Sequence, residues 1–209
     1  MPLEVNLALI LLAALIASIS PGPATLALAG TSMASGRKSG LAFASGITTG
    51  SLMWSVAAAL GLGAVMLANA WVFELIRYFG AAYLMYLAYK AARSAFSNKD
   101  LETKSFTGGK RSLYLKGLAL HLTNPKAILF FGSLFSLGIP PGTGVEQLAI
   151  VIAAVGLQSF LVFHGYALLF SSKGMTRVYL KLRRWFEGAF AIGFGAASFK
   201  ILTAKVQSP

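Results

Sequence analysis

Long apolar segments without a polar face are the feature that most constrains the fold of this chain. The runs at residues 5–17, 52–68 and 148–157 are almost wholly hydrophobic or small, whereas a surface helix of a soluble protein has one apolar stripe. Of the 209 residues, 56% are hydrophobic and 11% are charged, against about 25% charged residues in an ordinary soluble domain. A soluble fold of this size has too little interior for these side chains. We therefore expect a protein embedded in lipid.

Six segments are long enough to cross a membrane, for which a helix needs about 20 residues. We place them at residues 5–33, 40–67, 70–92, 113–137, 146–170 and 186–204. Lipid cannot hydrogen-bond to an unpaired backbone, and the segments lack the alternation of barrel strands, so α-helices are predicted. The start of the chain, MPLEVN, has an acid and no basic residue, and we expect the first segment to be retained as a span rather than cleaved as a signal peptide.

Basic residues predict how these segments are oriented. Most of the 18 lysines and arginines lie in three alternate connections, around residues 37–38, 90–116 and 173–184. The positive-inside rule places these connections in the cytoplasm, so both termini are expected on the periplasmic side. In a soluble protein a net charge of +12 would suggest nucleic acid. Here we interpret the basic clusters as topology signals beside anionic membrane lipid, and no nucleic-acid partner is expected.

A polar segment near the middle divides the chain into two units. We place the first at about residues 1–93, a cytoplasmic linker at about 94–111 and the second at about 112–209, within one transmembrane domain covering residues 1–209. Because each unit has an odd number of spans, the second enters the membrane in the opposite direction, as in the inverted repeats of many transporters. The predicted fold class is an all-α integral membrane protein with six helices in two inverted three-helix repeats.

Each unit begins with a proline-interrupted span, which predicts that helices 1 and 4 are broken. The motifs are Ser20-Pro21-Gly22-Pro23 and Thr123-Asn124-Pro125-Lys126. Proline removes an N–H group and clashes with the preceding turn, while Ser or Asn before it caps the helix that follows. A half-helix that begins inside the bilayer points N–H groups and a partial positive charge into the bundle, which suits a substrate carboxylate.

Lys126 and His121 add ionisable groups to this candidate substrate site. An ammonium group inside the bilayer must find a partner or a water-filled cavity. His121 lies one turn before Pro125 and belongs to the residue type that titrates near neutral pH. No Asp or Glu lies well inside a predicted span, and Glu187 stands close to the cytoplasmic start of the last one. The alternative is that both prolines only kink packed helices while Lys126 extends toward the membrane surface.

Several motifs, taken in order, resemble those of the LysE/RhtB family of bacterial amino-acid exporters over essentially the whole chain. They are Ser20-Pro21-Gly22-Pro23, Gly36-Arg37-Lys38-Ser39-Gly40 followed by Gly46 and Gly50, Gly80-Ala81-Ala82-Tyr83-Leu84, Thr123-Asn124-Pro125-Lys126-Ala127-Ile128-Leu129-Phe130-Phe131, and Gly165-Tyr166-Ala167. The resemblance implies a multi-pass protein of the bacterial inner membrane that exports amino acids with the proton motive force. The Asn-Pro-Lys form is similar to the homoserine, threonine and leucine branch, which favours a neutral substrate.

Two positions depart from the pattern of that family. Many members carry Asp or Asn where this chain has Ser51, and Asp where it has Ser159. Both serines are carried over as candidate cavity residues. The full candidate substrate site is then Ser20, Pro21, Gly22, Pro23, Thr123, Asn124, Pro125, Lys126, Ser51, Ser159 and His121. No catalytic, metal or cofactor site is expected, because the chain has no Cys and its spans lack paired acids or a cluster of metal ligands.

These features predict a secondary transporter rather than an enzyme, exporting a small neutral amino acid or amino-acid derivative from the bacterial cytoplasm. The expected partners are this amino-acid-like solute and membrane lipid, with protons as a candidate coupling ion and a homodimer as a candidate assembly. Two alternatives stay open at this point. One is an exporter of another small metabolite or toxic analogue, and the other is a structural membrane subunit that transports nothing.

Overall fold

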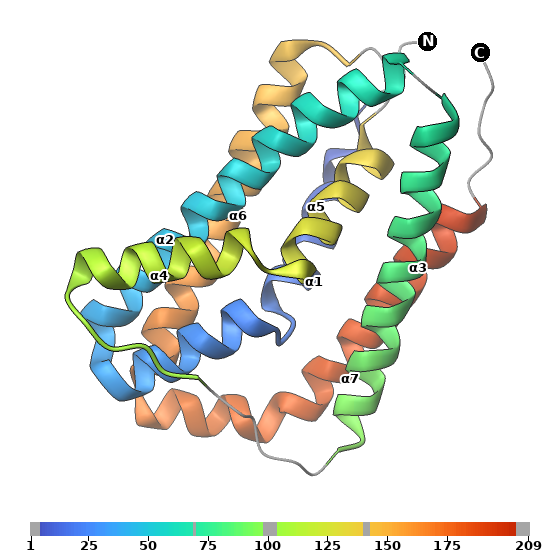
Figure 1. Cartoon of the computed structure of the whole chain (residues 1–209). Helices are drawn as coiled ribbons and strands as arrows, with labels where there is room; N and C mark the ends of the chain where they lie inside the picture. The colour runs from blue at the N-terminus through green and yellow to red at the C-terminus, as the bar shows by residue number, and fades with distance from the viewer. Residues whose placement is uncertain (1–4, 69, 98–103, 140–142, 204–209) are drawn as a thin grey trace.

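The computed structural model describes residues 5–68, 70–97, 104–139 and 143–203, and within these ranges the chain forms seven helices and no strand (Figure 1). The helices are α1 (Leu7–Ile19), α2 (Pro23–Ala68), α3 (Ala70–Ala95), α4 (Lys110–Leu122), α5 (Pro125–Gly138), α6 (Val145–Phe170) and α7 (Lys173–Thr203). The prediction of an all-α fold is confirmed for these residues. Residues 98–103 of the predicted linker lie outside the described part of the chain.

The boundaries of the helices differ from the six predicted spans in three places. The predicted span 5–33 contains α1 and the start of α2, and the span 113–137 contains most of α4 and α5. Conversely, α2 continues through Gly36, whose backbone angles (φ 77°, ψ −179°) are not helical and divide it into two arms. Such a positive φ is accessible to Gly without strain. Finally, α7 begins at Lys173, so the basic segment before the last predicted span is helical as well.

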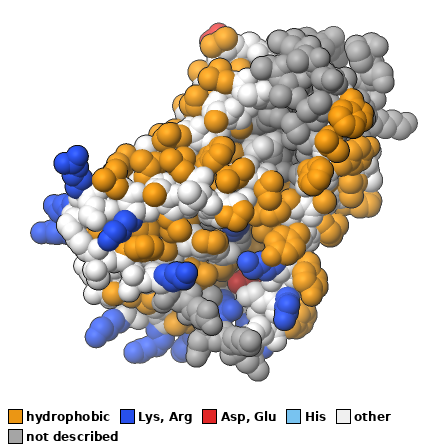
Figure 2. Space-filling model, in the orientation of Figure 1, with side chains coloured by type: hydrophobic (Ala, Val, Ile, Leu, Met, Phe, Trp, Pro, Cys, Tyr) orange, Lys and Arg blue, Asp and Glu red, His pale blue; other side chains and the backbone are white. Residues whose placement is uncertain are grey.

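Among the described residues, two helical regions are long and apolar enough to cross a membrane. They are the Pro23–Gly61 part of α2 and the whole of α6, while α1 is apolar but shorter. Large hydrophobic side chains also cover much of the outer surface (Figure 2). Leu60 is 69% exposed and Leu161 is 62% exposed. An apolar surface this extensive is typical of a protein that contacts lipid.

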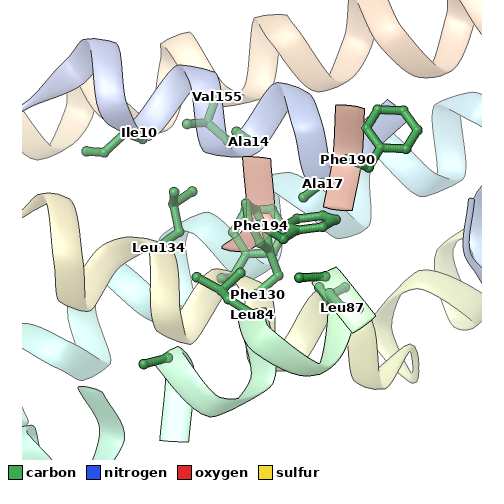
Figure 3. Packing of buried hydrophobic residues seen from close by; sticks show 14 of the residues in the cluster. Ile10, Ala14, Ala17, Leu84, Leu87, Phe130, Leu134, Val155, Phe190 and Phe194 are labelled. Atoms are coloured by element: carbon green, nitrogen blue, oxygen red, sulfur yellow. The ribbon is translucent and has the colours of Figure 1, made fainter. Parts of the chain in front are cut away.

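Helices from the two halves of the chain pack against each other. The helix α2 contacts α4 and α6, α3 contacts α7 and α5, and α1 lies against α5, α6 and α7. In Figure 1, α3 and the end of α7 therefore form one flank, α2, α4 and α6 form the other, and α1 and α5 lie between them. Figure 3 shows the apolar packing in this middle region, where Ala14 of α1, Phe130 of α5 and Phe194 of α7 belong to one cluster of buried side chains.

Charged side chains are concentrated at one end of the molecule. Lys and Arg residues gather in the lower half of Figure 2, where α4 and α7 begin and α3 ends. The helix α1 begins, and α7 ends, in the upper half of the same view. On this face of the molecule the described Lys and Arg residues thus lie mostly toward one end.

The backbones of α2 and α4 touch where they cross. A Cβ atom added at Gly46 would lie 2.0 Å from the carbonyl oxygen of Tyr114, and one added at Gly117 would lie 2.3 Å from the carbonyl oxygen of Phe43. Small residues at both positions permit this approach, as they do in many membrane helix pairs. Because the opposing atoms belong to the backbone, they have no rotamer that would make room.

We expect Gly46→Ala to destabilise the protein by about 1 to 3 kcal/mol, because the added methyl group forces the two helices apart. A lower melting temperature of the detergent-purified protein, followed by intrinsic fluorescence, measures this effect. Gly165→Ala is the matched control, since a Cβ at Gly165 meets nothing within 4 Å. Equal melting temperatures for Gly46→Ala and the wild type would contradict the close crossing.

Candidate functional site

The chain leaves the helical conformation between α1 and α2. Ser20 is extended (ψ 138°), and its backbone N–H still donates to the carbonyl of Ile16. Gly22 N–H donates to Thr25 Oγ1 at 2.8 Å, and the Thr25 hydroxyl lies 3.1 Å from the Gly22 carbonyl. Thr25 thus satisfies the N–H before the first turn of α2, in the manner of the third helical residue in a capping box.

A second interruption separates α4 from α5 and is satisfied by Asn124. The side-chain oxygen of Asn124 accepts a hydrogen bond from the Lys126 backbone N–H at 3.1 Å, directly before a helix that starts at Pro125. Asn124 is buried and acts as an ordinary N-cap. The backbone N–H of Lys126 at the start of α5 therefore already has a hydrogen-bond partner. A carboxylate bound beside this helix start would have to interact with the Lys126 side chain instead.

Lys126 links the two interruptions. Its Nζ donates to the carbonyl oxygen of Ser20 at 2.8 Å and also contacts the Ser20 hydroxyl. The lysine stem lies against Gly22, where an added Cβ would be 3.0 Å from Lys126 Cδ and 3.3 Å from Nζ. Gly22 therefore leaves the space that the lysine occupies. We call this contact between Lys126 and Ser20 the Lys126–Ser20 bridge.

Two cavities meet at the Lys126–Ser20 bridge. Ser20, Gly22 and Lys126 line both of them. The inner cavity has a volume of about 40 Å³, which is room for about one water molecule. The larger cavity, here called the vestibule, has a volume of about 390 Å³ and falls in the range of small-molecule pockets, about 300–1,000 Å³.

The vestibule has a positive lining with one acid. Lys90 and Lys104 are exposed and lie at its solvent side, and Lys126 lies at its inner end. Glu187 is the single acidic residue among the described residues that line it. Cationic linings of this kind raise the local concentration of anionic groups.

The inner cavity is lined by hydroxyls, an imidazole and aromatic rings. His121 Nε2 lies 3.1 Å from Ser51 Oγ, and the ring packs edge-on against Phe163. His121 Nδ1 is buried and has no hydrogen-bond partner among the described residues. Ser159 is buried and lines the same cavity. An unpartnered polar atom of this kind is typical of a site that holds water or a ligand.

The residues predicted from the sequence fall into three groups. Those that line the inner cavity are Ser20, Gly22, Ser51, His121, Asn124, Lys126 and Ser159. Pro21 and Pro23 line the vestibule instead. Thr123 and Pro125 are exposed and line neither cavity, and the Thr123 hydroxyl donates to the carbonyl of Ala119 in its own helix.

Two site residues were not singled out from the sequence. The first is Thr25, two residues after Pro23. Its position could have indicated a capping role, because a helix that starts at Pro23 has its capping-box residue there. The second is Glu187, whose place at the border of the last predicted span does not indicate a buried site residue. In the structure, Glu187 is only 3% exposed and lines the vestibule. Its burial depends on contacts with α3, which the sequence does not reveal.

Comparison with known proteins finds relatives along almost the whole chain. A family model described as LysE type translocator matches residues 15–205. The threonine efflux protein of Salmonella typhi is 34% identical over 188 residues, or 87% of this chain and 91% of that protein. The threonine efflux protein of Escherichia coli is 33% identical over the same shares. An uncharacterized membrane protein of Haemophilus influenzae is 28% identical over 84% of this chain and 86% of its own length. No solved structure matches the chain.

The two cavities predict different reactivity of cysteines introduced into this cysteine-free chain. In detergent-purified protein, Ala27→Cys, which lines the vestibule, is expected to react with a maleimide many-fold faster than Ala14→Cys, which lines the inner cavity. The two alanines are similarly buried, at 2% and 3% exposed, so the difference reports access through the cavity. Similar rates at the two positions would show that the bridge does not separate them.

Proposed function

The chain belongs to the LysE type translocator family, and on that premise we propose that it exports a small neutral amino acid from the bacterial cytoplasm, with threonine as the first candidate. Membership of this family makes the chain a membrane transporter of the amino-acid exporter class and confirms the prediction that it is not an enzyme. The neutral substrate is supported by the relatives that are named threonine efflux proteins and by the Asn-Pro-Lys motif.

The observation that carries the proposal is the Lys126–Ser20 bridge. The Lys126 ammonium group has only neutral oxygen atoms of Ser20 as hydrogen-bond partners among the described residues. A partly buried cation with neutral partners is incompletely compensated, and a carboxylate makes a stronger, charge-assisted hydrogen bond to it. An amino acid in the vestibule can therefore displace Ser20 from Lys126 through its carboxylate.

Displacement of Ser20 supplies a route from substrate binding to conformational change. The bridge holds the α1–α2 interruption against the α4–α5 interruption, so its loss releases the two from each other. The inner cavity of about 40 Å³ is too small for an amino acid, and passage requires a second conformation in which it is larger. A substrate that binds this second conformation more tightly would shift the population toward it.

We propose that the two interrupted segments are equivalent parts of two inverted repeats. In this scheme, α1 with the first arm of α2 corresponds to α4 with α5, each broken at a proline. The facing positions of Ser20 and Lys126 support the scheme, because inverted repeats place such broken helices on either side of one substrate site.

We further propose an inner-membrane location with both termini on the periplasmic side. The concentration of Lys and Arg at the end of the bundle opposite the start of α1 supports this orientation (Figures 1 and 2). The vestibule, which is rimmed by Lys90 and Lys104, then faces the cytoplasm. A membrane-impermeant maleimide would reach the Ala27→Cys variant in inside-out vesicles and not in right-side-out ones.

Protons are the proposed coupling ion, with His121 as the group that binds them. His121 borders the inner cavity, and its Nδ1 has no partner among the described residues. In this position it would take up a proton only when water reaches the inner cavity.

Export itself is tested by expressing the protein in a bacterial host that lacks its own amino-acid exporters. We expect external threonine to rise and tolerance of toxic threonine analogues to increase, measured by amino-acid analysis of the medium across a panel of amino acids and analogues. Export of another panel member would change the substrate. No change for any compound, with the protein present in the membrane, would leave the structural-subunit alternative as the better interpretation.

Lys126→Met is expected to lower the apparent affinity for the exported amino acid by about 10- to 100-fold, the value of one lost charge-assisted hydrogen bond. Efflux of labelled threonine from loaded vesicles at a series of concentrations measures this change. Lys181→Met is the matched control, because Lys181 is exposed on α7 and lines neither cavity. If both variants transport as the wild type does, Lys126 has no part in binding.

A further inference from the structure

Glu187 places a carboxylate in the vestibule, close to the cytoplasmic start of the last predicted span. The residue is 3% exposed, and it lines the same cavity as Lys126. Burial of a carboxylate costs several kcal/mol unless it is well paired, and ionisable residues inside membrane helices are commonly functional for that reason. The buried position of Glu187 therefore requires an explanation. The proposed binding of the substrate carboxylate by Lys126 does not provide one.

The protein itself provides partners for only one side of the Glu187 carboxylate. Ser94 Oγ donates to Oε1 at 2.9 Å, and Arg183 Nη2 donates to the same Ser94 hydroxyl at 3.1 Å. Arg183 Nε lies 4.0 Å from Oε1, at the outer limit of an ion pair. The other oxygen, Oε2, accepts no hydrogen bond from the residues that the structure describes. A carboxylate held in this way has a fixed position and an unused acceptor.

Besides the exposed Lys90 and Lys104, the vestibule thus carries one further cation and one anion, which different helices supply. Lys126 belongs to α5 and Glu187 to α7. Threonine and other neutral amino acids are zwitterions at neutral pH, with a carboxylate and an ammonium group on one carbon atom. A site that offers a partner to each charge rejects compounds that lack one of them, because the unmatched protein group is then left unpaired.

We infer that Glu187 receives the ammonium group of the exported amino acid in the vestibule, while Lys126 receives its carboxylate. This inference rests on the proposed export function and adds to it a basis for selecting amino acids over other carboxylates. Ser94 acts as a positioning residue that orients the Glu187 carboxylate. The competing explanation is purely structural, with the contact between Ser94 and Glu187 fastening α3 to α7.

The test compares L-threonine with its α-hydroxy acid analogue, in which a hydroxyl replaces the ammonium group. Purified full-length protein is reconstituted in liposomes, and each compound competes against efflux of labelled L-threonine. The wild type is expected to prefer threonine by about tenfold or more. Glu187→Gln keeps the shape and an acceptor for Ser94, and it is expected to lower the apparent affinity for threonine to that for the hydroxy acid. Affinity for the hydroxy acid should stay nearly unchanged.

Two further variants separate recognition from fastening. Ser94→Ala removes the hydroxyl between α3 and α7 but leaves the carboxylate, so it should keep a preference for threonine at whatever rate it transports. Glu187→Asp keeps the charge and should keep part of the preference. An equal loss of both affinities in Glu187→Gln would assign Glu187 to fastening and overturn the inference.

The wild type alone also tests the inference, even if Glu187→Gln does not fold. Transport of threonine without preference over the hydroxy acid overturns the role of Glu187 and leaves the export function standing. If the wild type moves neither compound nor any amino acid of the panel, the proposed function fails and the inference fails with it.

Discussion

The structure depends on satisfying backbone polar groups at two places where helices stop inside an apolar bundle. Lipid offers no hydrogen bonds, so each N–H and C=O released at an interruption must find a partner within the protein. Thr25 and Asn124 satisfy N–H groups at the starts of α2 and α5. The backbone carbonyl oxygen of Ser20 accepts a hydrogen bond from Lys126 Nζ, which comes from the other interruption. The α1–α2 interruption is therefore completed in part by the α4–α5 interruption, which lies beside it.

The same interaction joins stability to transport. Lys126 completes the hydrogen bonding of the backbone between α1 and α2. The same ammonium group is the proposed partner of the substrate carboxylate. In the proposed function, binding competes with an internal contact, so part of the binding energy would go into releasing that contact. This cost is consistent with a transporter, since an exporter that bound its substrate very tightly would release it slowly.

The sequence predicts the parts of this arrangement that depend on local chemistry. Helix ends lie beside both proline motifs, and the uninterrupted apolar runs indicate helices in lipid. Hydropathy does not distinguish a span from its flanking helix, so the helical basic segment from Lys173 and the continuation of α2 through Gly36 were not expected. The burial of Glu187 depends on Ser94, far away in the chain, and the sequence contains no local signal for such a contact.

The crossing of α2 and α4 at Gly46 and Gly117 limits which parts of the molecule can move. Two backbones in direct contact have no side-chain layer between them that can rearrange, so the second arm of α2 is held firmly against α4. In the proposed function, motion during transport then falls to the helices outside this crossing, among them α3 and α7 on the opposite flank. In the proposed transport cycle, the glycine contact would serve as a fixed frame against which the other flank tilts.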